Sequence, residues 1–478
     1  MKRLFLGFCL LVGFATKAQT VTDKPFLQDS AEKFSLEEGQ GNINLLQIAS
    51  DRNKAIKVLG SQGLMLPHEK RLRQDVQYRP LLDMDIVALA EYQGQFVYLT
   101  DQAVLSNAWA GKLYIDHNIK SPKAMGIGPD FLTLIAGEGD FALFKNNQEV
   151  WRAAISGLQP LSVQYDPNSG HFLLLTAEGL YQLDSVLKTS KKVFNGTNLT
   201  AFAFHGDRIV LGTANGIQYL DRKTYALNTL DEKLPWTEIT SVKNIRENLW
   251  FGSTKGAFKL RDDGKYDYYA SKRWLVDDEV VDLAEGPDGS VLVLTQEGMG
   301  KINFVPMTLA QKAEYFQEIQ RLRHIRYGFT SDLAMRTPGD LSTGYFHDTD
   351  NDGLWTSMYL AGELFRYAVT KSEDAKQNAY EAFEAMERLT ALPDLKGFPA
   401  RSFERDGYEV GLHANGFSEE WREQYVKETE GYGSYPRMNF GDGSRPPAAM
   451  NPVGIFSCTH FLPSWHPIRN GGIGPYIK

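Results

Sequence analysis

The first three hundred residues repeat a unit of about 40 residues, and this period restricts the fold more than any other feature of the sequence. In each unit an alternating apolar run passes through a short turn into a second apolar run, as in IVLGTANGIQYL and LWFGSTKGAFKL. The turn positions are Gly63, Ala103, Gly139, Gly179, Gly216, Gly256 and Gly298. Period-two alternation is typical of half-buried strands, and glycine supplies the positive φ that a tight hairpin needs.

A unit of this length holds four short strands, which is the size of one propeller blade. Closing the units into a ring also removes exposed sheet edges. A β-solenoid is the competing interpretation, but its repeats are normally shorter. The sequence therefore predicts an all-β, seven-bladed propeller over residues 25–305.

The last units of the array carry a further signature, in RENLWFGSTKGAFKLRDDGKYDYY and WLVDDEVVDLAEGPDGSVLVLTQEGMGKI. A short acidic segment precedes a strand, and a strand of Leu-Trp-φ-Gly-Thr type leads into the glycine turn. These units resemble the propeller repeats found in the sensor halves of two-component regulators, and the match decays toward the N-terminus. The same repeats occur in secreted bacterial proteins that have no kinase, so the resemblance implies a fold and leaves the role open.

The N-terminus and the composition indicate an exported protein. Lys2 and Arg3 precede an apolar core at residues 4–14, and small residues near Ala18 predict a signal peptide at residues 1–18. No other segment reaches membrane-spanning length. The net charge of −8 argues against a nucleic-acid partner. We therefore expect a periplasmic or secreted bacterial protein whose mature chain keeps one cysteine, Cys458.

From Pro306 the apolar period changes from two to about 3.6, which predicts helices. Thr308 is placed to cap a first helix that ends at Gly328, with one apolar stripe made of Leu309, Ala313, Phe316, Ile319, Leu322 and Ile325. A second helix, beginning near Gly353, is apolar on most sides and is predicted to be buried. Ser372 caps a third, amphipathic helix whose predicted buried stripe is Ala375, Ala379, Ala382, Phe383, Met386 and Leu389.

Four phrases in this region, RHIRYGF, PGDLSTG, HDTDNDGLWTSMYLAGELFRYAV and GFPARSF, resemble the opening of an (α/α) toroid domain attached to propellers in secreted bacterial proteins. Such toroids are common in polysaccharide lyases and glycoside hydrolases, so the resemblance implies a role on extracellular glycan. It predicts a smaller all-α, toroid-like region at residues 306–433. A complete toroid needs roughly 300 residues, so this region is predicted to be incomplete.

A carboxylate loop precedes the second helix. Asp348, Asp350, Asp352 and Gly353 match the opening of an EF-hand calcium loop, but Tyr359 occupies the position of the bidentate glutamate. Three interpretations remain: Asp352 as a helix N-cap, a calcium site completed by another loop, and a sugar-binding or catalytic role.

In the catalytic interpretation, His347 with Tyr345 or Tyr359 would supply the base and acid of a lyase. Arg323 or Arg326 would neutralise a uronate carboxylate, since guanidinium groups bind carboxylates bidentately. Two of the aspartates could instead form the carboxylate pair of a glycoside hydrolase.

The propeller offers a second place for a ligand, because sugars and peptides stack on exposed aromatic faces. The alternative for its large aromatic residues is packing between blades. The aromatic candidates are Trp109, Trp151, Trp236, Tyr268, Tyr269 and Trp274.

The last segment, residues 434–478, holds 7 of the chain's 20 prolines and 1 of its 59 acidic residues, with no helical period. It is predicted to be an irregular wrap around the propeller or out-of-frame translation. Three function classes remain open: a glycan-processing enzyme of lyase or hydrolase type, a non-catalytic propeller that binds a ligand or a partner protein, and a truncated inactive product. The expected partner is an extracellular polysaccharide or oligosaccharide.

Overall fold

The computed structural model describes residues 23–37, 43–76, 85–337, 340–346, 351–391, 397 and 399–401. These residues form two compact units, Pro25–Met307 and the part that begins at Thr308. The predicted signal peptide at residues 1–18 and the predicted tail at 434–478 lie outside the described residues.

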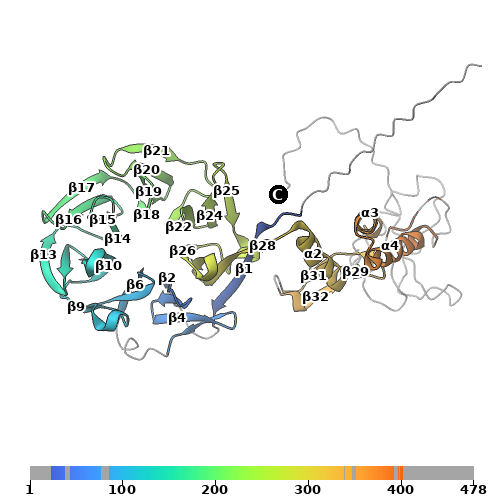
Figure 1. Cartoon of the computed structure of the whole chain (residues 1–478), viewed down its shortest axis with the longest axis horizontal. Coiled ribbons are helices and arrows are strands. Elements are labelled where there is room, and N and C mark those ends of the chain that lie inside the picture. Colours follow the sequence, from blue (N-terminus) through green and yellow to red (C-terminus); the bar gives the residue numbers. More distant parts are fainter. Residues whose placement is uncertain are drawn as a thin grey trace, which may run out of the picture. The chain divides into compact units, whose positions relative to one another are not determined.

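The first unit is mostly β and consists of small sheets arranged radially around a ring, as in a propeller (Figure 1). We call it the propeller unit. Five sheets have four antiparallel strands each. The first sheet contains β6 (Ile86–Tyr92), β7 (Gln95–Thr100), β8 (Ala103–Leu105) and β9 (Tyr114–Asp116). The second contains β10 (Pro122–Ile127), β11 (Thr133–Gly137), β12 (Asp140–Lys145) and β13 (Gln148–Ala154). The third contains β14 (Ser162–Asp166), β15 (His171–Thr176), β16 (Gly179–Asp184) and β17 (Thr189–Asn195). The fourth contains β18 (Leu199–His205), β19 (Arg208–Thr213), β20 (Gly216–Asp221) and β21 (Leu227–Asp231). The fifth contains β22 (Ile239–Ile245), β23 (Asn248–Ser253), β24 (Gly256–Leu260) and β25 (Tyr266–Tyr269).

The sixth sheet has eight strands and joins the two ends of the propeller unit. Its order is β2 (Leu45–Ser50), β3 (Ile56–Gly60), β4 (Gly63–His68), β5 (Arg71–Gln74), β1 (Phe26–Leu36), β28 (Gly298–Met307), β27 (Val291–Thr295), β26 (Val280–Glu285). β1 pairs with β28 in antiparallel register from Phe26↔Met307 to Ser35↔Gly298, and it meets β5 in parallel. β2 also packs against β26. The N-terminal strand therefore closes the ring.

The predicted turn positions precede or begin the third strand of each repeat, at β4, β8, β12, β16, β20, β24 and β28. The predicted positive φ is confirmed at Gly63, Gly139, Gly216, Gly256 and Gly298. Gly179 differs, because its φ lies outside the left-handed region. A Cβ there would lie 2.4 Å from the carbonyl oxygen of Phe194, so the close approach of β17 accounts for this glycine.

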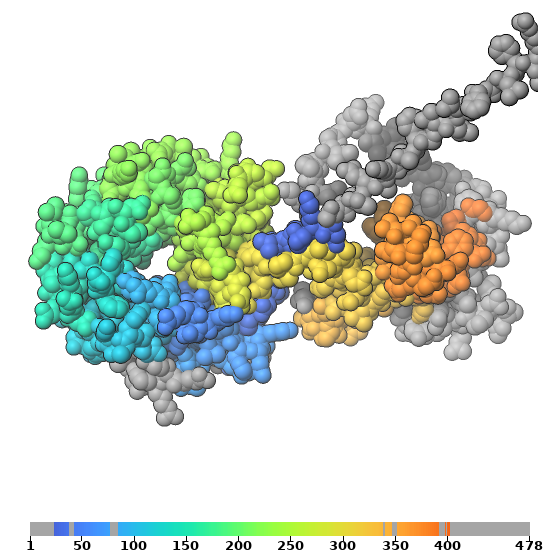
Figure 2. All heavy atoms as spheres, viewed as in Figure 1, coloured from blue at the N-terminus to red at the C-terminus, as the bar shows by residue number. Residues whose placement is uncertain are grey.

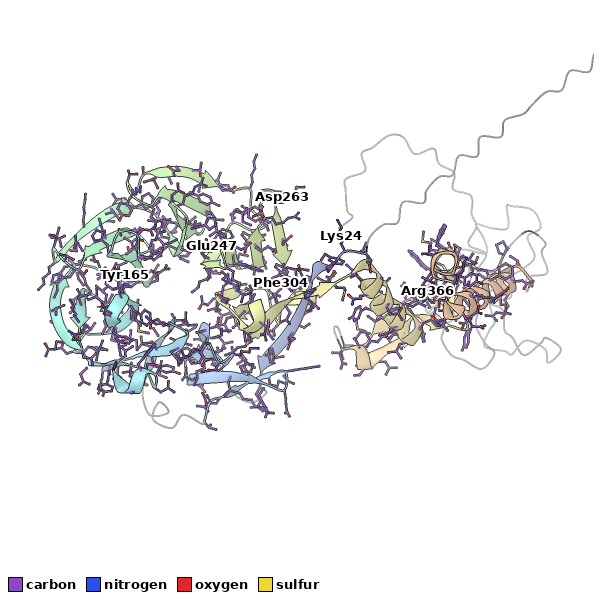
Figure 3. The ribbon with its side chains drawn as sticks, viewed as in Figure 1. Lys24, Tyr165, Glu247, Asp263, Phe304 and Arg366 are labelled. Carbon is purple, nitrogen blue, oxygen red and sulfur yellow. The ribbon has the colours of Figure 1, made fainter. Side chains whose placement is uncertain are left out.

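Apolar clusters fill the spaces between neighbouring sheets, and Figure 3 draws the side chains of the ring as sticks. Trp250 is 2% exposed, stacks on Tyr269 with ring centroids 5.4 Å apart, and meets the edge of Phe304 at 6.2 Å. The sheets therefore pack face to face around the ring, and the space-filling view leaves an opening near its centre (Figure 2).

The second unit contains α2 (Leu309–Arg323), α3 (Asp352–Thr370) and α4 (Glu373–Ala391), with two short hairpins, β29 (Ile325–Arg326) with β30 (Phe329–Thr330) and β31 (Leu333–Met335) with β32 (Gly344–Phe346). The predicted cap is confirmed, because Thr308 and Gln311 form a reciprocal capping box. A fourth helix, α1 (Ser271–Trp274), is a single turn in the propeller unit. None of these helices is both long and apolar enough to cross a membrane. α3 packs against α4, and the toroid stays a prediction.

Two predictions about these helices are wrong. α3 is not buried on most sides: Leu354, Met358, Phe365 and Val369 are at least half exposed, and its buried residues are polar. The predicted end of α2 is the second, since α2 ends at Arg323 instead of Gly328; Leu309 of its apolar stripe is 68% exposed. In α4 the predicted stripe is buried at its alanines and at Leu389, whereas Phe383 is 56% exposed. Small and polar side chains thus form the contact between α3 and α4.

Candidate functional site

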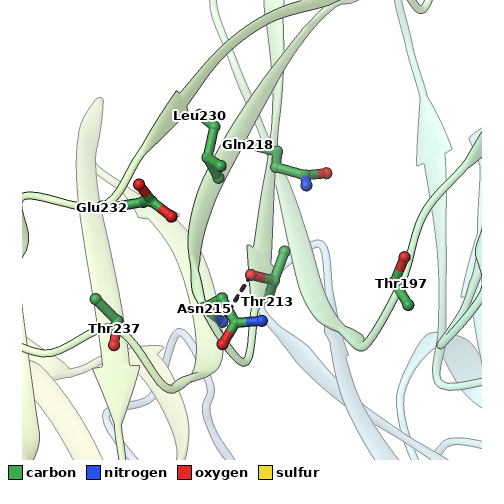
Figure 4. A pocket seen from close by; sticks show the side chains of 7 residues that line it. All are labelled: Thr197, Thr213, Asn215, Gln218, Leu230, Glu232 and Thr237. Carbon is green, nitrogen blue, oxygen red and sulfur yellow. Dashed lines mark hydrogen bonds between the residues drawn. The ribbon is translucent and has the colours of Figure 1, made fainter.

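The propeller unit carries an open cleft of about 490 Å³ beside the turn between β19 and β20 (Figure 4). A volume of this size is within the usual range for small-molecule sites. The lining residues come from that turn, from β20 and β21, and from the loops that lead into β18 and β22. They are Thr197, Thr213, Asn215, Gln218, Leu230, Glu232 and Thr237.

The floor of the cleft is a rigid turn. The hydroxyl of Thr213, which is 3% exposed, donates to the carbonyl oxygen of Gly216 at 3.0 Å and accepts from the N–H of Asn215 at 3.0 Å. The same contact recurs in four other repeats, through Thr100, Thr176, Ser253 and Thr295. The hydroxyl of Thr213 is therefore already used to stabilise the turn. The turn itself places the side chain of Asn215 at the surface.

Gln218 breaks the pattern of the repeats. It is the third residue of β20, and the third residues of the equivalent strands are apolar or glycine: Met65, Leu105, Ala142, Tyr181, Phe258 and Gly300. Most of those side chains belong to the apolar clusters between sheets. Gln218 instead lines the cleft, and its Oε1 is buried without a hydrogen-bond partner in the described part of the chain. A buried amide oxygen without a partner is destabilising unless a ligand or water satisfies it.

The neighbouring carboxylates have different environments. Asp231 accepts a hydrogen bond from the hydroxyl of Tyr266 at 3.1 Å. Burial, followed by nearby Tyr219 and Asp231, raises the pKa of Tyr266, so this hydroxyl stays a donor. Glu232 is exposed, and no hydrogen bond or ion pair engages its side chain within the described residues. Asp231 therefore fixes the end of β21, while Glu232 is available to a ligand.

Of the aromatic candidates, Trp236 and Tyr268 are exposed, at 38% and 44%. The indole N–H of Trp236 donates to Thr254 Oγ1 at 2.8 Å, which holds the ring beside the next turn and one residue from Thr237 of the cleft. Tyr269 is 1% exposed, and Trp109, Trp151 and Trp274 pack edge-on against other aromatic rings. Packing between sheets therefore explains these four residues. Of the predicted aromatic candidates, Trp236 is the nearest in sequence to the cleft.

No protein-family model matches the sequence, and no curated protein matches it either. Solved structures of similar fold include a streptogramin B lyase, with a TM-score of 0.47, 12% identity, and coverage of 58% of this chain and 98% of that one. Another is the extracellular domain of a putative hybrid two-component system from B. thetaiotaomicron (TM-score 0.46, 11% identity, 58% and 39% covered). The WD40 domain of Neurospora crassa Pan2 is a third (TM-score 0.45, 13% identity, 55% and 91% covered). At these values no functional argument follows from the likeness.

In the second unit, two residues of the predicted site form a buried ion pair. The guanidinium of Arg326, which is 4% exposed, lies 2.7 Å from the carboxylate of Asp352, which is 0% exposed. Asp352 is the first residue of α3 and Asn351 is the N-cap, so the N-cap interpretation of Asp352 is off by one residue. The pair gives both residues a structural explanation.

Each of the other predicted site residues has its own contacts or position, or is not described. The hydroxyl of Tyr359 accepts from Gln317 Nε2 at 2.9 Å, and burial raises its pKa. Tyr345 is 42% exposed beneath the guanidinium of Arg336, and Arg323 ends α2. His347, Asp348 and Asp350 lie outside the described residues. Among the residues that are described, no group of three or more His, Cys, Asp or Glu side chains is placed to hold a metal. The lyase, hydrolase and calcium hypotheses therefore stay predictions.

One sequence signal for the cleft lies in the repeats themselves. Aligning the repeats by their turns places a glutamine where most other repeats have a large apolar residue. A polar residue at such a position does not pack between sheets as its counterparts do, which indicates a different role for its side chain.

Proposed function

We propose that the chain is an exported, non-catalytic binding protein whose propeller unit takes a hydroxyl-rich ligand, such as an oligosaccharide, in the cleft beside the β19–β20 turn. The observation that carries the proposal is Gln218, whose buried amide oxygen lines the cleft without a hydrogen-bond partner among the described residues. Burying an unpaired polar group costs stability, so a ligand hydroxyl that donates to Oε1 would recover that cost.

The lining chemistry supports this class of ligand. Amide groups of Asn215 and Gln218 both donate and accept hydrogen bonds, Glu232 accepts, and the hydroxyls of Thr197 and Thr237 can do either. Among the described residues no lysine or arginine lines the cleft, so none of them would compensate the charge of an anionic ligand. Leu230 is 48% exposed and offers an apolar surface for the C–H face of a sugar ring. We therefore expect neutral oligosaccharides to bind in preference to uronates.

We propose that the ring supporting this site has seven blades. The eight-stranded sheet divides into one group of four strands, β2–β5, and a second group, β26, β27, β28 and β1. The first strands of these groups, β2 and β26, pack against each other, and each also packs against the first strand of a neighbouring sheet, β6 and β22 respectively. With the five separate sheets this division gives seven similar four-stranded blades.

The test is thermal unfolding of the mature chain with a panel of neutral and uronate oligosaccharides. At a concentration of 100 Kd a ligand stabilises by about 2.7 kcal/mol, equivalent to several degrees in melting temperature. Gln218→Leu should remove the shift while leaving the ligand-free protein as stable as before or more stable, because leucine restores the apolar residue of the other repeats.

The matched control is Gln182→Leu, which makes the same change on β16 outside the cleft lining and should keep the shift. A chain that shows no shift with any neutral oligosaccharide at millimolar concentration would contradict the saccharide proposal. A shift that survives Gln218→Leu would place the site elsewhere.

A further inference from the structure

α3 exposes a continuous apolar stripe to solvent. Leu354 is 50% exposed, Met358 61%, Phe365 74% and Val369 84%, and Ala361 and Ala368 are exposed between them. Apolar side chains exposed singly are normal on a protein surface, but a contiguous stripe along a whole helix marks an interaction surface.

Specific contacts on the opposite side of α3 fix the orientation of the helix in its unit. Its buried residues are Asp352, Thr356 and Glu363, and each has a specific partner. Thr356 Oγ1 accepts from the N–H of Thr330 at 3.0 Å, and Glu363 Oε2 accepts from Asn378 Nδ2 at 3.1 Å. Rotating α3 to bury the stripe would break these contacts together with the ion pair of Asp352, so the stripe must be covered from outside.

The spacing of the stripe identifies the shape of its partner. Leu354, Met358, Ala361, Phe365 and Ala368 follow one another at intervals of four, three, four and three residues. Such a seam packs against another helix by interdigitating side chains, at a crossing angle of about 20°. A helix is therefore the partner that fits this surface.

We infer that residues 418–430 of this chain cover the stripe as an additional helix. Ser418 with Glu419 and Glu420 is a helix start signal, Gly431 is a stop signal, and Phe417, Trp421 and Tyr425 recur every fourth residue. Among the segments outside the described residues, the tail at 434–478 is rich in proline and has no such period. The gaps within the described ranges are too short for a helix of this length.

The connection favours this intramolecular partner over a second copy. The N–H of Ala400 donates to the carbonyl oxygen of Leu389 at 2.6 Å, and Leu389 lies beside Gly353. The chain therefore leaves the described unit close to the first turn of α3. Residues 402–417 can reach roughly 50 Å when extended, and a helix of 19 residues is about 28 Å long. A tethered segment also has an effective concentration near the millimolar range.

Cysteine accessibility in the full mature chain tests the inference. In a Cys458→Ser background, Phe365→Cys places one thiol in the stripe, and Glu384→Cys places one on the exposed side of α4. We expect a maleimide to label Phe365→Cys at least about tenfold more slowly than Glu384→Cys. Adding Trp421→Asp should abolish that protection, whereas adding Glu423→Asp, on the opposite face of the segment, should preserve it. Val369→Cys provides a second probe if Phe365→Cys disturbs packing, and circular dichroism checks that each variant retains its helices.

Three outcomes would overturn the inference. Equal labelling of both thiols in the parent background means that the stripe is not covered. Protection that is unchanged by Trp421→Asp means that another part of the chain covers it. Protection that disappears on dilution means that the partner is a second copy.

Discussion

The buried ion pair of Arg326 and Asp352 allows a quantitative test of whether the carboxylate loop has a structural role. At 2.7 Å the attraction between the two charges is about 6 kcal/mol with an effective dielectric constant of about 20. The desolvation of each ion costs several kcal/mol, so the net contribution of the intact pair is small. Removing one partner is different, because the remaining charge stays buried.

We expect Asp352→Asn to lower the local unfolding free energy of α3 by about 3 kcal/mol, the lower end for a broken buried pair, since asparagine keeps the volume and one acceptor. Replacing both residues, as Arg326→Met with Asp352→Leu, should bring the loss back to within about 1 kcal/mol of the parent chain.

The assay is native-state hydrogen exchange of the α3 and α4 amides in the full chain, which measures the second unit separately from the propeller unit. A loss below about 1 kcal/mol for Asp352→Asn would refute the reasoning. If Asp352 were a calcium ligand instead, a chelator would speed exchange in the parent chain and have no effect on Asp352→Asn.

Two further predictions concern the propeller unit. Asp166 is 1% exposed and accepts from Arg222 Nε at 3.1 Å; burial acts to raise its pKa, but the hydrogen bonds and charge of Arg222 outweigh burial and hold the pKa below its usual value. The contribution of the ionised Asp166 to stability is therefore complete above about pH 4 and is lost as the pH falls through the lowered pKa. Urea unfolding of Asp166→Asn should show a loss of about 3 kcal/mol in unfolding free energy at pH 7, and this loss should shrink toward pH 2. A loss that does not depend on pH would contradict this. Gly252→Ala would place a Cβ 2.5 Å from Val280 Cγ1 and should cost about 1–3 kcal/mol by overpacking, partly recovered by adding Val280→Ala; a neutral single variant would disprove the close packing.

The repeat array could be predicted from the sequence because strand alternation and turn glycines are local signals. The turn positions fall at the third strands as expected, although Gly179 serves a close approach instead of a positive φ. The cleft could not be predicted in the same way, because a cleft depends on which side chains from separate loops converge. Thr197 and Thr237, for example, precede different strands and meet only in the folded ring.

The helical region was harder to predict. The periodicity around α3 correctly indicates a helix, but its apolar composition cannot say which side of the helix meets α4. The small residues Ala375, Ala379 and Ala382 bring α4 close to the polar side of α3 and leave the large side chains outside. The ion pair of Asp352 with Arg326 was not predicted for a related reason: the two residues are 26 apart in sequence, and no local pattern connects them.

The pairing of β1 with β28 also determines how the propeller unit responds to pulling. Phe26 and Met307 are paired, so the chain enters and leaves the unit at the same end of one antiparallel ladder. Tension between the segment before Pro25 and the segment after Met307 would act on the first hydrogen bond of that ladder. Once that bond breaks, the tension would act on the next one, so the hydrogen bonds would break one after another instead of together. The two strands would peel apart like a zip, at a lower force than a sheared pair of the same length. The strand that closes the ring is thus also the place where a mechanical load would open it first.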